Sequence, residues 1–189
     1  MKIGVLALQG AVETHTRSFK ALGVSCAEVR TPAQLDDVDA LVVPGGESTT
    51  MSKLLDTSAL RAPLVERLNA GMGAFGTCAG MIVLAKEVLD GRSDQRSLGA
   101  IDITVRRNAF GRQVDSFEAD LDVLGLEGPF HGVFIRAPFV EDVGDSVNVL
   151  ASVNGHPVLC QQGQVVVSAF HPELTADLRL HEQFLDLVS

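Results

Sequence analysis

The chain has 189 residues, of which 46% are apolar, and a formal net charge of −9. This length predicts one domain with a substantial core. The negative charge, with no basic run, argues against nucleic acid or an anionic membrane surface as a partner. No apolar stretch approaches the length of a membrane span, and residues 1–8 lack the cleavage region of a signal peptide.

The first half of the chain predicts strands that alternate with helices. Apolar, β-branched runs predict strands at residues 3–8, 24–29 and 39–43, and helical spacing covers residues 12–22, 48–55 and 59–70. Thr31-Pro32 should begin a further helix, because a capping residue precedes proline at the first turn. Strands in such alternation form a parallel sheet that helices cover on both faces.

The sequence Gly76-Thr77-Cys78-Ala79-Gly80 follows an apolar run and precedes another. We interpret it as a strand, a sharp turn and a helix that begins at once, the arrangement that exposes a nucleophile at the top of a sheet. The positive end of the helix would favour the reactive thiolate of Cys78. A buried, unreactive cysteine is the alternative that this motif alone leaves open.

The pattern changes after residue 91. A polar loop at 91–97 is followed by short alternating segments between residues 101 and 167, which predict antiparallel or mixed strands. Asn154-Gly155 is typical of a hairpin turn. A last buried strand is predicted at 165–170 and a last helix at 176–187. The three cysteines, Cys26, Cys78 and Cys160, show neither a zinc spacing nor a disulfide framework, which fits a reducing, cytoplasmic location.

His171-Pro172-Glu173 directly follows the last predicted strand. In extended chain, a step of two residues would put His171 and Glu173 on the same side. Glu173 could then orient the imidazole while His171 takes the proton of Cys78, as base and orienting acid do in a triad. A purely structural His171 is the alternative. His156-Pro157 is followed by Val158 and has no such acid, so we expect His156 at the surface.

Residues 44–50, Pro-Gly-Gly-Glu-Ser-Thr-Thr, end the third predicted strand, where ligands sit in open parallel sheets. Paired glycines let backbone N–H groups approach a developing oxyanion. A plain loop whose Ser48 or Thr49 caps the next helix is the alternative. Residues 71–76 spell Gly-x-Gly-x-x-Gly, but they follow a helix and lead into a strand, so we reject nucleotide binding.

With these motifs assembled, the chain resembles the triad (class I) glutamine amidotransferases over essentially its whole length. The resemblance is closest to the family of glutaminase subunits of pyridoxal 5′-phosphate synthase. The runs that carry it lie at residues 6–11, 44–49, 76–82, 107–113, 134–138 and 170–175. The runs at 107–113 and 134–138, Arg-Asn-Ala-Phe-Gly-Arg-Gln and Phe-Ile-Arg-Ala-Pro, single out this family.

The resemblance implies a single type 1 amidotransferase domain over residues 1–189, with a three-layer, flavodoxin-like α/β fold, a mostly parallel sheet and an antiparallel or mixed extension. It implies hydrolysis of L-glutamine to glutamate and ammonia through a Cys78 thioester, with no metal or organic cofactor. The ammonia would pass to a synthase subunit that forms a dodecameric core and makes pyridoxal 5′-phosphate.

The resemblance also assigns roles to residues. The catalytic triad would be Cys78, His171 and Glu173, and backbone N–H groups of Gly46 and Ala79 would form the oxyanion hole. The substrate contacts would come from Gly46, Glu47, Ser48, Arg107, Ile135 and Arg136. Arginine suits a carboxylate through its forked donors, although either arginine could be an ordinary surface residue.

Two rival classes share parts of this pattern. In cysteine-elbow proteins resembling DJ-1 and intracellular protease I, a histidine typically follows the cysteine at once, whereas here Ala79 follows. The glutaminase subunit of another amidotransferase, such as that of imidazole glycerol phosphate synthase, would lack the runs at 107–113 and 134–138.

Overall fold

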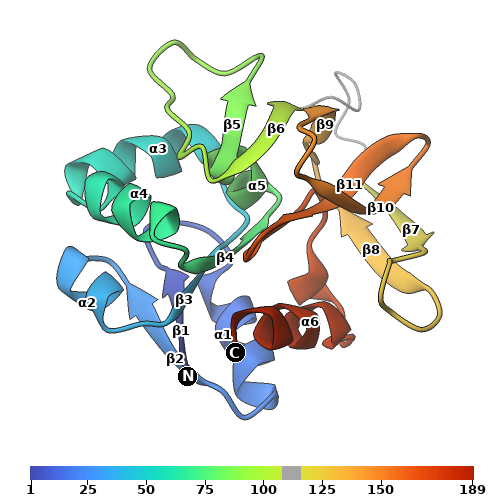
Figure 1. The fold of residues 1–189 in the computed structure, drawn as a ribbon, viewed down its shortest axis with the longest axis horizontal. Helices are drawn as coiled ribbons and strands as arrows, with labels where there is room; N and C mark the ends of the chain where they lie inside the picture. Colours follow the sequence, from blue (N-terminus) through green and yellow to red (C-terminus); the bar gives the residue numbers. More distant parts are fainter. Residues whose placement is uncertain (108–115) are drawn as a thin grey trace.

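The computed structural model describes residues 1–107 and 116–189. In these residues the central element is a seven-stranded sheet with the strand order β10-β11-β12-β4-β3-β1-β2 (Figure 1). Its members are β1 (Lys2–Leu6), β2 (Ser25–Val29), β3 (Ala40–Val43), β4 (Gly73–Thr77), β10 (Asn148–Val153), β11 (His156–Gln162) and β12 (Val165–Ser168). The five strands from β12 to β2 are parallel, and β10 and β11 extend the sheet antiparallel.

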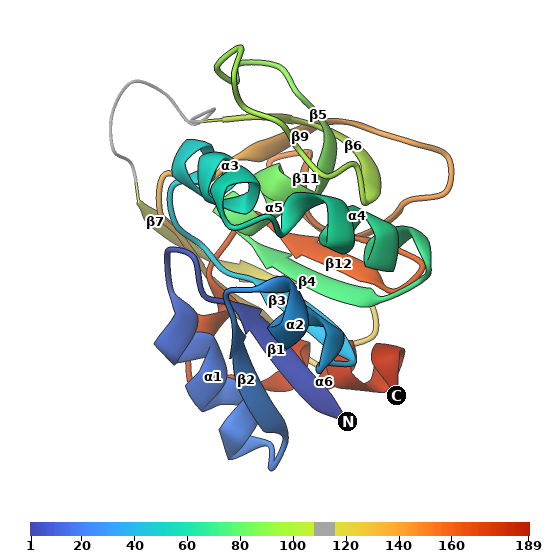
Figure 2. The same cartoon turned by 90° about the vertical axis from the view of Figure 1, so that its left-hand side faces the viewer.

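Helices cover both faces of this sheet (Figure 2). On one face lie α1 (Val12–Ala21) and α6 (Arg179–Val188), and on the other lie α2 (Pro32–Asp36), α3 (Ser48–Thr57), α4 (Arg61–Asn69) and α5 (Ala79–Leu84). The strands β3 and β4 are buried along their whole length because both of their faces are covered. The expected α/β fold with a mostly parallel sheet is therefore confirmed.

Two smaller sheets lie beyond the central one, above α5 and at the side of β10 and β11 in Figure 1. The first contains β5 (Ala85–Val88), β6 (Ile101–Arg106) and β9 (Phe139–Val143), and the second pairs β7 (Phe117–Leu121) with β8 (Phe130–Phe134). β5 pairs parallel with β6, and the other two pairings are antiparallel. The expected mixed extension is therefore confirmed.

The local signals and the observed elements agree in several places. Thr31 caps α2 through a hydrogen bond from the backbone N–H of Gln34. Asn154 and Gly155 both have positive φ, as the predicted hairpin turn requires. The helix expected from residue 59 begins two residues later, at Arg61, and the last helix begins at Arg179 rather than at 176.

Gly80 packs closely against the central sheet, at the end of β3. A Cβ on Gly80 would lie 2.0 Å from the carbonyl oxygen of Val43 at the end of β3. Backbone cannot move aside as a flexible side chain can, so α5 and the turn before it are held against β3 only because residue 80 has no side chain.

We therefore expect Gly80→Ala to lower the free energy of unfolding by about 1–3 kcal/mol, as overpacking does. Gly91→Ala is the matched control, because its Cβ would meet side chains and no backbone, with Val88 at 3.2 Å and Gln95 at 3.6 Å. Urea unfolding of both variants measures the difference. Equal stability of the two would contradict the close packing of α5 on β3.

Candidate active site

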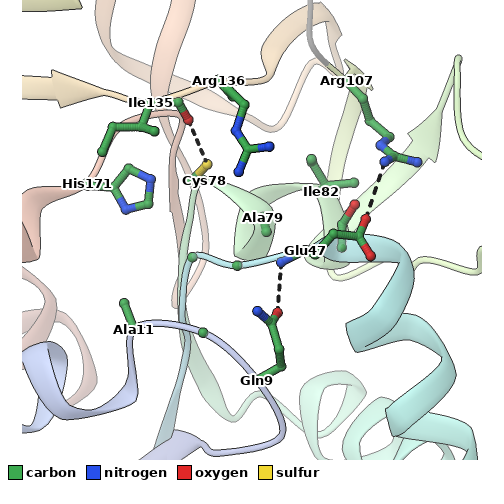
Figure 3. A pocket seen from close by; sticks show the side chains of 14 residues that line it. Gln9, Ala11, Glu47, Cys78, Ala79, Ile82, Arg107, Ile135, Arg136 and His171 are labelled. Carbon is green, nitrogen blue, oxygen red and sulfur yellow. Dashed lines mark hydrogen bonds and ion pairs between the residues drawn. The ribbon is translucent and has the colours of Figure 1, made fainter. Parts of the chain in front are cut away.

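A pocket of about 470 Å³ lies at the carboxyl ends of β1, β3 and β4 (Figure 3). The chain runs from β1 to β2 on one side and continues with β3 on the other side of β1. Loops at such a switch point diverge and leave a crevice, which is where open α/β sheets bind ligands. The pocket is lined by Gln9, Gly10, Ala11, Gly45, Gly46, Glu47, Ser48, Cys78, Ala79, Ile82, Arg107, Ile135, Arg136 and His171.

Cys78 stands at the turn between β4 and α5, as the sequence predicts. Its backbone has φ 50° and ψ −103°, a conformation that residues with a Cβ rarely adopt. Its N–H donates to the carbonyl of Ser168 on β12 at 2.8 Å, and its carbonyl accepts from Met81 N at 3.1 Å. These bonds hold the turn and present the side chain to the pocket.

His171 and Glu173 meet as the sequence predicts, with Nδ1 of His171 at 2.7 Å from Oε1 of Glu173. The backbone between them differs from the prediction. Residues Pro172–Leu174 form a 3₁₀ turn rather than extended chain, because the carbonyls of His171 and Pro172 accept from Leu174 N and Thr175 N. The expectation of an extended step was therefore wrong, although the side chains converge.

The electrostatics of this pair favour charge on both partners. Burial opposes the charged form of His171, but hydrogen bonds with Cys78 and Glu173 outweigh it and raise its pKa to about 10. Burial likewise opposes ionisation of Glu173, but the hydrogen bond from His171 and the charge of its imidazolium hold the pKa of Glu173 below the usual value. Glu173 is thus a buried carboxylate and His171 an imidazolium at neutral pH.

The peptide between Gly45 and Gly46 has a defined orientation. The carbonyl of Gly45 accepts a hydrogen bond from Ala11 N at 3.0 Å. In a trans peptide the following N–H points the opposite way, so the Gly46 N–H points away from the turn that contains Ala11. Figure 3 shows Gln9 and Ala11 on one side of the segment that leads to Glu47, and Cys78 and Ala79 on the other.

Gly10 explains why this turn can approach so closely. It has φ +105°, and a Cβ there would lie 1.9 Å from the carbonyl oxygen of Gly45. The side chain of Gln9 completes the contact, because its Oε1 accepts from Glu47 N at 2.8 Å. The loops that follow β1 and β3 are therefore joined directly beside the pocket.

Glu47 caps α3 rather than reaching freely into the pocket. Its two carboxylate oxygens accept from Thr49 N at 3.1 Å and Thr50 N at 2.8 Å. Although partial burial opposes ionisation, hydrogen bonds from Thr50 and Thr49 lower the pKa of Glu47 to about 2. Ser48, which begins α3, is buried, and its hydroxyl accepts from Gln95 Nε2 at 3.1 Å. The capping alternative for Ser48 and Thr49 was therefore wrong, since Glu47 takes that role.

Arg107 lies on the pocket wall with its guanidinium already engaged. Nη1 donates to Thr49 Oγ1 at 3.1 Å and to Gln95 Oε1 at 2.8 Å, and Nη2 lies 3.4 Å from Glu47 Oε1. The structure thus gives Arg107 a place beside Glu47 and Ser48, held by side chains that include the unpredicted Gln95. The rest of its motif, residues 108–113, lies outside the described residues.

Ile135 and Arg136 line the pocket beside Cys78. The thiol of Cys78 donates to the carbonyl of Ile135 at 3.7 Å. Arg136 has φ 46°, in the left-handed region that residues with a side chain seldom occupy. Such strain is often found at ligand sites. His156, by contrast, is exposed on β11, as expected.

Several pocket residues were not among the predicted site residues. Gln9, Gly10, Ala11, Gly45 and Ile82 line the cavity, although the motifs at 6–11, 44–49 and 76–82 contain all five. His15 was also missed, and its Nε2 lies 3.5 Å from Oε2 of Glu173. The sequence could have indicated His15, because a histidine on the apolar face of a predicted helix needs a buried polar partner.

Among residues 1–107 and 116–189, no three His, Cys, Asp or Glu side chains are grouped as the ligands of a metal ion would be. No helix among them combines the length and apolar character needed to cross a bilayer.

Comparison with known proteins decides the family. The model of the SNO glutamine amidotransferase family matches residues 5–189. The chain belongs to the SNO glutamine amidotransferase family. Two similar proteins, from Mycobacteroides abscessus and Frankia alni, are both named pyridoxal 5′-phosphate synthase subunit PdxT. They are 60% and 57% identical over 186 and 188 residues, which cover 98% and 99% of this chain and 96% and 94% of those proteins.

The SNO family fold is also found in a solved structure described as a glutamine amidotransferase. Its sequence is 51% identical to this chain. The superposition covers 98% of each of the two chains and has a TM-score of 0.93. The predicted family is therefore confirmed, and neither the intracellular protease I class nor another amidotransferase is needed to explain the motifs.

The cap formed by Glu47 yields a stability prediction. A group whose pKa is lowered on folding stabilises the fold above its unfolded pKa, near 4.5, and this stabilisation is lost as the pH falls toward 2. Glu47→Gln should therefore lower the free energy of unfolding by about 1 kcal/mol at pH 7, typical of a weakened cap. Urea unfolding at pH 7 and pH 3 should show the difference shrinking with acid. Glu13→Gln, at an exposed site on α1, is the control, and a pH-independent gap would refute the cap assignment.

Proposed function

We propose that this chain hydrolyses L-glutamine to glutamate and ammonia, with Cys78 as nucleophile, His171 as acid and base, and Glu173 as orienting acid. The observation that carries the proposal is that Cys78, on a strained turn, and His171 line one pocket, while the buried Glu173 is bonded to His171 at 2.7 Å. The glutaminase activity of the SNO family and the PdxT names of its relatives support the substrate.

The reaction would proceed in two steps. His171 takes the thiol proton of Cys78, the resulting thiolate attacks the side-chain amide carbon, and the imidazolium then gives that proton to the departing ammonia. Water, activated by the now neutral His171, then cleaves the thioester and releases glutamate. The raised pKa of His171 supports its protonated state before attack. Glu173 stabilises that charge and holds the imidazole in place.

The oxyanion of each tetrahedral intermediate would be bound by the backbone N–H groups of Gly46 and Ala79. Support comes from the hydrogen bond between Ala11 N and the carbonyl of Gly45, which directs the Gly46 N–H away from Ala11. Ala79 begins α5, so its N–H is among those that no helical bond satisfies.

The glutamine itself would be held by Gly46, Glu47, Ser48, Arg107, Ile135 and Arg136, which line the same pocket. Glu47 and its neighbours form the wall on the α3 side. The cation of Arg107 is partly neutralised by Glu47, so the substrate carboxylate would share it rather than pair with it alone. Arg136 makes none of these contacts and offers a second cation across the pocket.

The ammonia would pass to the synthase subunit of pyridoxal 5′-phosphate synthase, the enzyme named in its PdxT relatives. That partner would be a dodecameric core that carries copies of this chain, in the cytoplasm. The turn formed by Gln9 and Gly10 would be part of the docking surface, because it joins the loop that carries the Gly46 donor.

The triad assignment predicts that Cys78→Ala abolishes glutamine hydrolysis while the fold survives. Removal of a nucleophile costs about ten-thousandfold or more, whereas the variant loses a single sulfur atom from packing. Glutamate release with the synthase subunit present measures activity, and circular dichroism checks the fold. Residual turnover near that of the wild type would show that another residue attacks the amide.

The proposed function also predicts that glutamine turnover depends on the synthase subunit. One hydrogen bond, from Ala11 N, holds the peptide of Gly45 in the productive orientation, and glycine permits the reverse orientation at low steric cost. We expect turnover to rise when the synthase subunit is added. The upper bound is the effect of one oxyanion donor, about a hundred- to thousandfold.

Gly46→Ala tests the same loop, because its Cβ would lie 2.3 Å from Gln9 Oε1. This variant should remain slow with the partner present. Equal turnover of the wild type with and without the synthase subunit would show that the hole is fully formed in the free chain.

A further inference from the structure

Two buried histidines lie behind the triad, on the face of the sheet that α1 and α6 cover (Figure 2). His15 belongs to α1 and His181 to α6, and both are fully excluded from solvent. Nε2 of His181 lies 3.4 Å from Nδ1 of His15. Neither histidine lines the pocket, so the reaction proposed above leaves both without a role.

The other ring nitrogen of His15 reaches the triad. Its Nε2 lies 3.5 Å from Oε2 of Glu173 and 3.0 Å from Oγ1 of Thr77, the residue before Cys78. Oε2 of Glu173 is buried without a hydrogen bond to any described residue, whereas Oε1 is bonded to His171. His15 therefore faces the carboxylate oxygen that His171 leaves unpaired.

The contacts favour one tautomer of each ring. The hydroxyl of Thr77 can donate to or accept from Nε2 of His15, whereas the carboxylate of Glu173 only accepts, so the Nε2 that faces both should carry the proton. Nδ1 of His15 must then accept, and Nε2–H of His181 is the donor opposite it. This leaves a lone pair at the unpartnered Nδ1 of His181. With the opposite tautomers, Nδ1 of His181 would be a buried N–H without a partner, which is rarer in proteins than a buried lone pair without one. Nε2 of His15 would then aim a lone pair at the carboxylate.

Both rings are neutral in this arrangement. Burial lowers the pKa of His15, more strongly than the nearby Glu173 raises it. Burial and the neighbouring His15 lower the pKa of His181 to about 3. A neutral donor suits this place, because a second cation beside Glu173 would compete with His171 for the carboxylate charge.

We propose that His15 is a positioning residue for the glutaminase reaction: its Nε2–H holds the free oxygen of Glu173 so that the other oxygen stays aimed at His171. His181 fixes the tautomer of His15 from behind. This inference rests on the proposed function, since it gives His15 a role only through the triad. The 3.5 Å separation is within the range that catalytic hydrogen bonds show before substrate binds and tightens them.

A pH dependence follows. The titratable groups that face Glu173 are His171 on its own turn, His15 from α1 and, behind His15, His181 of α6 with Asp177 beside it. The strand β8 also packs on this turn, but its His131 is exposed and paired with Glu118 and Asp120. Without the donor of His15, a buried oxygen of Glu173 has no partner, and the carboxylate should protonate at higher pH.

His15→Met and His15→Gln form a matched pair of variants. The two side chains have nearly equal length, and both lose the ring, but only glutamine keeps an N–H donor near the position of Nε2. We expect His15→Met to lower kcat about tenfold to a hundredfold with KM for glutamine unchanged. In the plot of kcat against pH, the acid limb of His15→Met should move to higher pH by about one unit. His15→Gln should keep most of the wild-type kcat and the wild-type dependence of kcat on pH.

A double-mutant cycle shows whether His15 acts through Glu173. In the Glu173→Gln background, His15→Met should cost no further activity, because the group that His15 holds is gone. Equal losses in His15→Met and His15→Gln, or an undiminished loss in the Glu173→Gln background, would mean that His15 only packs the core.

If the His15 variants do not fold, a measurement on the wild-type protein can still test the proposal. The ¹⁵N spectrum of histidine-labelled protein should show a neutral His15 with the proton on Nε2. The opposite tautomer, or a charged ring at neutral pH, would overturn the proposal. If the wild type released no glutamate even with the synthase subunit, the proposed function would fail, whereas the tautomer would still be read independently.

Discussion

Cys78 is held at φ 50° and ψ −103°, a conformation that a residue with a side chain keeps only where its surroundings impose it. The pairing of β4 with β3 and β12 supplies one constraint, through the bond from Cys78 N to Ser168 O. The other constraint is steric. A Cβ on Gly76 would lie 2.8 Å from the backbone of Gly80, and one on Gly80 would meet Val43. The strain that exposes the sulfur is thus offset by the packing of the central sheet.

Three further segments of the site come to Cys78 because parallel strands of the central sheet end at one edge. β1 brings the turn of Gln9, β3 brings the Gly45 loop, and β12 leads into His171. No two of these segments are neighbours in the sequence. Each is fixed by a contact with the next, such as the bonds from Ala11 N to Gly45 O and from Glu47 N to Gln9 Oε1. These contacts favour one arrangement of the loops at the sheet edge, and donors placed before the reaction are what electrostatic stabilisation of an oxyanion requires.

The sequence predicted those parts of the site that local chemistry specifies. The cysteine turn, the pairing of His171 with Glu173 and the glycine loop each follow from a few adjacent residues. What the sequence did not predict depends on partners far along the chain. His15 meets Glu173 and His181 only after folding, and Gln95 reaches Arg107 from a polar loop that carries no pattern. The 3₁₀ turn was missed for another reason, since proline permits both extended and helical φ.

The buried layer between the sheet and the helices α1 and α6 shows how stability and chemistry share the same atoms. Phe75 of β4 packs edge-on against His15 and His181, with ring centroids 6.3 and 5.8 Å away. Phenylalanine at both histidine positions would fill similar space without any polar atom to satisfy. A core that instead retains two neutral imidazoles accepts the cost of burying polar groups. That cost is offset where buried acceptors require a donor, and His15 faces two of them, the hydroxyl oxygen of Thr77 and the carboxylate of Glu173.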